Sequence, residues 1–123
     1  MSKKILVIED DQSLRKALSE KIVAEGYVFL EAKDGEAGLE LALQHKPDLI
    51  LLDIIMPKMD GITMLKKLRE DEWGKSAPII VLTNLDSVSN LAEVLNEDVH
   101  DYLIKADWSL EDIAKKIKAK LAE

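Results

Sequence analysis

The 123-residue sequence contains no cysteine, which excludes a disulfide framework and a metal site built from thiolates. It also lacks a long hydrophobic run, because its longest apolar stretch is far below the ~20 residues that a membrane span needs. The apolar run near the amino terminus is too short for a signal peptide. We find no linker, repeat or low-complexity tract. These absences favour a cytoplasmic protein without membrane insertion.

Positive charge is in short supply. The chain has 17 Lys and Arg residues against 24 Asp and Glu residues, and its formal net charge is −7. This balance argues against direct, unaided binding to nucleic acid. Part of the negative charge is concentrated in the run Glu9-Asp10-Asp11, which indicates a cation rather than an anion as the resting ligand.

Strand and helix patterns alternate along the whole chain, and its length is that of one domain, residues 1–123. Five βα units of this kind predict an α/β fold, a parallel sheet with helices on both faces. The expected strands are residues 4–8, 27–32, 48–52, 79–82 and 101–104. The expected helices are 12–24, one that Asp34 caps and that runs to about His45, one capped by Asp60, 88–97, and one that starts at Ser109, where Asp112 completes a capping box.

Four of the five apolar runs that are expected to be strands stop at chemically reactive polar side chains: carboxylates, a hydroxyl and an ammonium group. The first run ends in Glu9-Asp10-Asp11, the third in Asp53, the fourth in Thr83 and the fifth in Lys105. Because open α/β folds bind ligands at the carboxyl ends of their strands, we expect these side chains in one pocket. The pocket would hold three carboxylates, those of Glu9, Asp10 and Asp53, together with one hydroxyl and one ammonium group.

Carboxylates that lie this close repel one another unless a cation neutralises them or one of them retains a proton. Mg²⁺ prefers oxygen ligands and uses one or two protein carboxylates, so Glu9, Asp10 and Asp53 suit it. Such a metal could also hold a phosphoryl group. Asp53 could then act as a nucleophile, because carboxylates form acyl phosphates. Lys105 and Thr83 would stabilise the phosphoryl oxygens.

The ordered set of motifs resembles the response-regulator receiver domain of two-component signalling, of the single-domain chemotaxis type. The resemblance covers essentially the whole chain and rests on Glu9-Asp10, on Asp53 followed by Pro57 and Gly61, and on Thr83, Tyr102 and Lys105. It implies a flavodoxin-like (βα)5 fold with strand order 2-1-3-4-5.

The resemblance also implies a function. Asp53 would accept a phosphoryl group from a sensor histidine kinase or a phosphotransfer protein with Mg²⁺, and the Ile55 backbone carbonyl would complete the protein ligands of the metal. Thr83 and Tyr102 match the switch residues of the family. Output would pass through contacts with an unknown target protein or through onward phosphotransfer, from a monomer or a phosphorylation-dependent dimer. No output domain is expected, since the receiver takes up the chain.

Other interpretations of the same residues stay open. A metal-dependent phosphohydrolase also uses an aspartate nucleophile, but such enzymes usually carry a second acid two residues later, where this chain has Ile55. A degenerate receiver used only for docking is a third class. Asp11 suits a helix cap, and the lysines of the last helix suit a solvated face. The chain departs from the family pattern at Asn84, at Asp98-Val99 and at Ala106.

Overall fold

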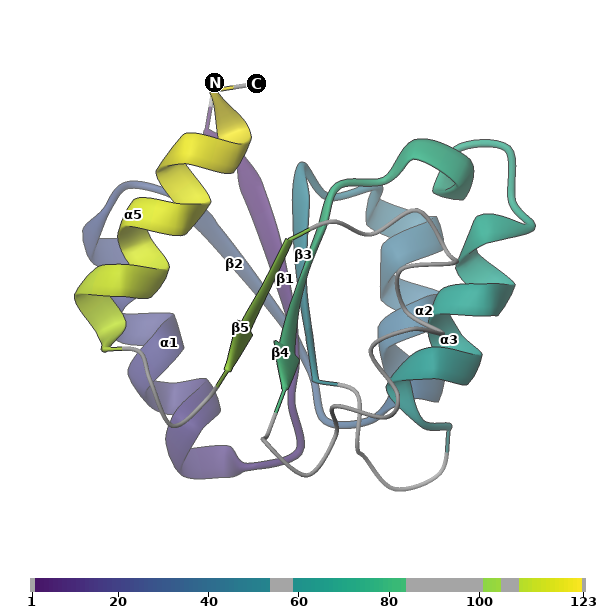
Figure 1. The fold of residues 1–123 in the computed structure, drawn as a ribbon, viewed down its shortest axis with the longest axis horizontal. Helices are drawn as coiled ribbons and strands as arrows, with labels where there is room; N and C mark the ends of the chain where they lie inside the picture. The colour runs from purple at the N-terminus through teal and green to yellow at the C-terminus, as the bar shows by residue number, and fades with distance from the viewer. Residues whose placement is uncertain (1, 54–58, 84–100, 105–108, 123) are drawn as a thin grey trace.

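The computed structural model describes residues 2–53, 59–83, 101–104 and 109–122. Its centre is a parallel sheet of five strands in the order β2-β1-β3-β4-β5, which confirms the predicted topology (Figure 1). The strands are β1 (Lys4–Ile8), β2 (Val28–Ala32), β3 (Leu49–Asp53), β4 (Ile79–Thr83) and β5 (Asp101–Ile104). Helices cover both faces of this sheet.

Two helices lie on each face among the described residues. Helices α1 (Gln12–Ala24) and α5 (Leu110–Leu121) cover one face, and α2 (Gly35–His45) and α3 (Gly61–Arg69) cover the other (Figure 1). A short 3₁₀ helix, η1 (Gly74–Ser76), follows α3 and was not predicted. The predicted helix at residues 88–97 lies outside the described residues. No helix of the described segments is long and apolar enough to cross a membrane.

Side-chain caps determine where the helices begin. Asp11 accepts hydrogen bonds from the backbone N–H groups of Ser13 and Leu14, which satisfies donors that the first turn leaves open. Asp34 and Asp60 cap α2 and α3 in the same way. Ser109 and Asp112 form a reciprocal capping box at α5. All of these capping residues were predicted from the sequence.

The bounds of β1 and β5 match the predicted ones, and those of β2, β3 and β4 differ by one residue. Strand β2 begins at Val28 because the Tyr27 N–H still donates to Ile22 O of α1, at 3.2 Å. Strand β3 extends to Asp53, whose backbone pairs with Leu82 of β4. Gly26 makes the turn between α1 and β2 with a φ of 92°, a conformation that favours glycine.

The sheet separates two hydrophobic cores. Leu6, Ile8, Ile50 and Leu52 point toward α2 and α3, while their neighbours in the strands point toward α1 and α5. The inner strands β1, β3 and β4 have no polar alternation because both of their faces are buried, as in other parallel sheets. On α3 the apolar side chains of Met64, Leu65 and Leu68 are buried, and Ile62 is half-buried against the same core.

An ion pair joins the outer surfaces of α1 and α5. The Lys21 ammonium contacts the Glu111 carboxylate across the two helices, and Glu25 lies 3.4 Å from the same ammonium. The hydrogen bond with Glu111 raises the pKa of Lys21, and the same bond lowers the pKa of Glu111. Because Glu25 and Glu111 are exposed, this surface ion pair contributes little to the stability of the fold.

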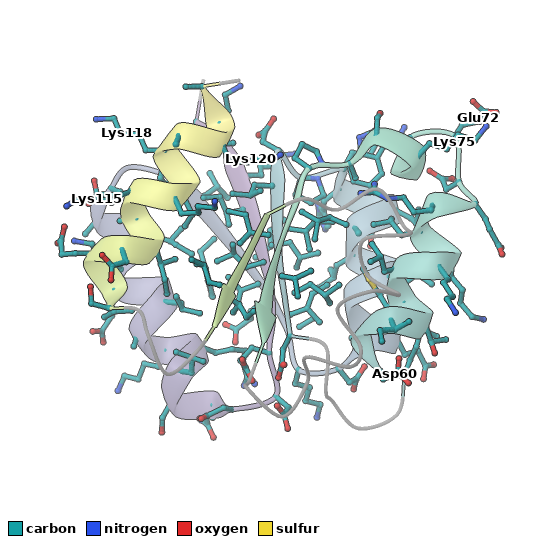
Figure 2. All side chains as sticks on the ribbon, in the orientation of Figure 1. Asp60, Glu72, Lys75, Lys115, Lys118 and Lys120 are labelled. Carbon is teal, nitrogen blue, oxygen red and sulfur yellow. The ribbon has the colours of Figure 1, made fainter. Side chains whose placement is uncertain are left out.

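The lysines of α5 do not form a single stripe. Lys115 and Lys118 project from one side of the helix and Lys120 from another, as Figure 2 shows. Lys115 and Lys118 are exposed, as predicted for a solvated face, while Lys116 and Lys120 are half-buried.

Candidate functional site: an acidic cluster at the carboxyl edge of the sheet

Strand register brings the ends of β1 and β3 together. Ile8 pairs with Leu52, so the residues that follow them, Glu9 and Asp53, lie at the same level of the sheet edge. Glu9 continues the alternation of Ile5 and Val7, and Asp53 continues that of Leu49 and Leu51. Both carboxylates therefore start from the sheet face that α1 and α5 cover.

The carboxylates differ in their exposure to solvent. Glu9 is fully buried and Asp53 is 4 % exposed, whereas Asp10 is exposed. One oxygen from each of these three residues lies within 4.8 Å of the other two. Two carboxylates of the cluster are thus buried and the third is in contact with solvent. This arrangement suits a cation that keeps part of its water shell. The donor set, which contains only carboxylate oxygens, fits Mg²⁺.

Backbone contacts hold the loop that carries Glu9 and Asp10. The Glu9 N–H donates to Ala32 O at 3.0 Å, and the Asp11 N–H donates to the Glu9 Oε2 at 3.2 Å. Asp11 also caps α1, so both ends of this short loop are fixed. The cap confirms the predicted structural role of Asp11, which is absent from the cluster.

Arg15 contacts the same loop, and the sequence analysis did not single it out. Its Nη1 donates to the carbonyl oxygens of Glu9 at 2.8 Å and Asp10 at 3.3 Å. Its Nε donates to Glu31 Oε1 of β2 at 3.0 Å. Arg15 lies one helical turn after Asp11, and this spacing is the sequence signal that could have placed it near the loop.

Met59, the first described residue after Asp53, contacts the start of α2. The Gly35 N–H donates to Met59 O at 3.0 Å. A Cβ at position 35 would lie 2.0 Å from the same oxygen, so this approach requires glycine. Asp60 then caps α3 at the edge of the molecule where the strands end (Figure 2).

The remaining predicted site residues are described only in part. Thr83 is the last residue of β4 and pairs with Ile104 of β5, and Tyr102 of β5 pairs with Val81 of β4. Thr83 therefore ends its strand one residue past Leu82, the partner of Asp53. The side chains of Thr83 and Tyr102, and all of Ile55, Pro57 and Lys105, lie outside the described residues.

Comparison with known proteins agrees with this architecture. The family model described as "Response regulator receiver domain" matches residues 5–118. The response regulator MprA of Mycobacterium ulcerans is 37 % identical over 121 residues, which are 98 % of this chain and 51 % of that protein. The chain thus spans about half the length of the curated relatives it matches.

Solved structures give the same result. The receiver domain of response regulator 1452 from Francisella is 31 % identical, with a TM-score of 0.86 and 98 % of each chain covered. The receiver domain of the sensor histidine kinase PA1611 from Pseudomonas aeruginosa PAO1, solved with a magnesium ion in its active-site cleft, has a TM-score of 0.89 over both whole chains. At 24 % identity, that likeness concerns the fold alone. By sequence and by fold, the chain belongs to the response-regulator receiver domain family.

Proposed function

We propose that residues 1–123 form a phosphorylation-controlled signalling switch in which Asp53 accepts a phosphoryl group. The observation that carries the proposal is the group of three carboxylates from Glu9, Asp10 and Asp53 within 4.8 Å at the end of the sheet. The donor would be the phosphohistidine of a sensor histidine kinase or of a phosphotransfer protein.

Each group of the proposed site would have its own part in phosphoryl transfer. An Asp53 carboxylate oxygen forms a P–O bond while the P–N bond of the phosphohistidine breaks, and the electron pair of that bond returns to the imidazole nitrogen. Glu9, Asp10, Asp53 and the Ile55 carbonyl would hold Mg²⁺, which when bound neutralises phosphoryl oxygens. Thr83 would donate a hydrogen bond and Lys105 a positive charge to the same oxygens.

The switch would follow from the same contacts. Thr83 would move toward the phosphoryl group, and Tyr102 would turn inward as a result. Moving a conformational equilibrium from 1:99 to 99:1 takes about 5.5 kcal/mol. One charge-assisted hydrogen bond supplies only about 1.5–3 kcal/mol, so Thr83 and Lys105 must act together. The changed surface would then meet a protein target, or the phosphoryl group would pass onward.

The alternative function, that of a phosphohydrolase, usually requires a second acidic residue two positions after the aspartate nucleophile. Position 55 is Ile, which cannot protonate a leaving group. Membership of the receiver family also favours a switch, and we propose that the chain does not turn over a separate substrate. The two functions differ in stoichiometry, since a switch retains about one phosphoryl group whereas an enzyme releases many.

A phosphoramidate donor, which carries a P–N bond, tests the proposal. Incubated with Mg²⁺, the wild-type protein should gain the mass of one phosphoryl group, and the gain should vanish without Mg²⁺ and in Asp53→Asn. Asp34→Asn is the matched control, because Asp34 is also 4 % exposed and Asn still caps α2. Labelling of Asp53→Asn at the wild-type rate would refute the assignment. Multiple turnovers of a phosphate monoester would favour the enzyme.

A further inference from the structure

The Arg15 guanidinium connects three segments beside the acidic cluster. From the first turn of α1 it donates to the loop after β1, through the Glu9 and Asp10 carbonyls, and to Glu31 on β2. The Arg15 side chain is 14 % exposed and the Glu31 side chain 56 %, so the arginine is the better enclosed member of the pair. These bonds use the rigid, planar fork of donors that distinguishes Arg from Lys.

The two carbonyl contacts fix the backbone on both sides of Asp10. The Glu9 carbonyl belongs to the peptide plane before the Asp10 Cα, and the Asp10 carbonyl belongs to the plane after it. Because peptide units are planar, holding both oxygens restricts the φ and ψ angles of Asp10. Those angles set the direction in which its side chain leaves the backbone.

Asp10 needs this restriction more than its neighbours in the cluster. Glu9 and Asp53 are buried, so surrounding atoms limit their rotamers, whereas Asp10 is exposed. A metal ligand that is not held in place loses side-chain and backbone entropy when the ion binds. Contacts that orient a ligand in advance therefore raise affinity without touching the metal.

We propose that Arg15 is a positioning residue for the metal site, and that Glu31 holds Arg15 in place. The inference rests on the proposed function, since it assumes that Asp10 binds Mg²⁺. Arg15 acts through the backbone of Glu9 and Asp10 and does not itself contact the ion. The site would then include a residue of β2, a strand that contributes nothing to the acidic cluster.

The sign of the effect separates positioning from simple electrostatics. A positive charge near a cation site repels the cation, so removing Arg15 would tighten Mg²⁺ binding if charge alone mattered. Positioning predicts the opposite. We expect Arg15→Met to weaken Mg²⁺ binding by about tenfold, the lower end of the effect of residues that orient metal ligands. Arg15→Lys keeps the charge but loses the fork, and should also weaken binding.

Matched variants isolate each contact. Lys16→Met removes an exposed positive charge from the next position of α1 and should leave the affinity unchanged or slightly higher. Glu31→Gln keeps an acceptor oxygen for Arg15 Nε and should bind Mg²⁺ as the wild type does. Glu31→Leu removes the acceptor and should give a loss smaller than that of Arg15→Met.

Isothermal titration with Mg²⁺ alone measures these affinities, and the amide NMR shifts of Glu9 and Asp10 report the loop directly. Unfolding in urea shows which variants are folded, and Arg15→Lys and Glu31→Leu keep the test decisive if Arg15→Met does not fold. Suppose that Asp10→Asn weakens Mg²⁺ binding but the Arg15 variants bind Mg²⁺ as tightly as the wild type, or more tightly. This result would overturn the role of Arg15 and leave the proposed metal site standing. Equal binding by wild type and Asp10→Asn would instead overturn the proposed metal site.

Discussion

Asp53→Asn should stabilise the metal-free protein, although it removes the group proposed to accept the phosphoryl. In the absence of a cation, the carboxylates of Glu9, Asp10 and Asp53 lie within 4.8 Å of one another. Like charges at this distance repel, and the folded state has to hold them together. Replacing one carboxylate by a neutral amide of nearly the same shape removes two of the three repulsions.

The magnitude follows from the distance. Two unit charges 4.8 Å apart repel by about 0.9 kcal/mol in water and by about 3.5 kcal/mol at an effective dielectric constant of about 20. Asp10 is exposed and each charge is shared by two oxygens, so solvent and salt reduce these values. We expect Asp53→Asn to raise the free energy of unfolding by about 1–2 kcal/mol in EDTA.

Mg²⁺ should make the wild type more stable than Asp53→Asn. At a concentration 100 times its dissociation constant, a ligand that binds only the folded state adds about 2.7 kcal/mol to its stability. The wild type gains this amount, while Asp53→Asn has lost a ligand and gains less. The stability curves of the two proteins should therefore cross as Mg²⁺ is added.

Urea unfolding at neutral pH, in EDTA and along a Mg²⁺ series, measures the crossing. Asp34→Asn, equally buried but outside the cluster, should leave the response to Mg²⁺ unchanged. High salt should shrink the advantage of Asp53→Asn in EDTA. The reasoning fails if Asp53→Asn is less stable than the wild type in EDTA, or if Mg²⁺ stabilises both proteins equally.

Three further predictions concern the elements around the site. Gly35→Ala should lower the free energy of unfolding by about 1–3 kcal/mol and slow phosphorylation, because its Cβ would lie 2.0 Å from Met59 O. Gly26→Ala is the control: Gly26 has a φ of 92° and no atom within 4 Å of an added Cβ, so the substitution should cost about 1–2 kcal/mol and leave the phosphorylation rate unchanged. Hydrogen bonds from Ser109 lower the pKa of Asp112 from its ordinary value of 3.8. The Asp112 carboxylate therefore stabilises the fold at neutral pH, and this contribution is lost as the pH falls through the lowered pKa. Urea unfolding curves of Asp112→Asn and the wild type should converge only in that acidic range. Thr83→Ala should still accept a phosphoryl group on Asp53 but lose the conformational response, and an NMR response equal to that of the wild type would rule out the proposed coupling.

Local chemistry made most of the fold predictable. The cap residues Asp11, Asp34, Asp60 and Ser109 each act on the helix that follows within three residues, so the sequence alone contains the interaction. Burial on both faces of the sheet removed polar alternation from the central strands, and this pattern is also local. Boundaries were less certain, as at Tyr27, whose N–H still belongs to the last turn of α1.

Contacts between distant segments were not predictable in the same way. The convergence of Glu9, Asp10 and Asp53 was expected because parallel strands end at one edge of the sheet. The bonds of Arg15 to Glu31 and of Gly35 to Met59 depend on how α1 and α2 sit on that sheet.

Reductive trapping of the phosphorylated protein tests the central claim most directly. Borohydride reduces an acyl phosphate to an alcohol, so a phosphorylated aspartate becomes homoserine at its own position. After treatment with phosphoramidate and Mg²⁺, peptide mapping should find homoserine at position 53, and Asp53→Asn should yield none. Homoserine at Asp10 or Asp34 with an unchanged residue 53, or a phosphoryl group retained on a histidine, would contradict the account.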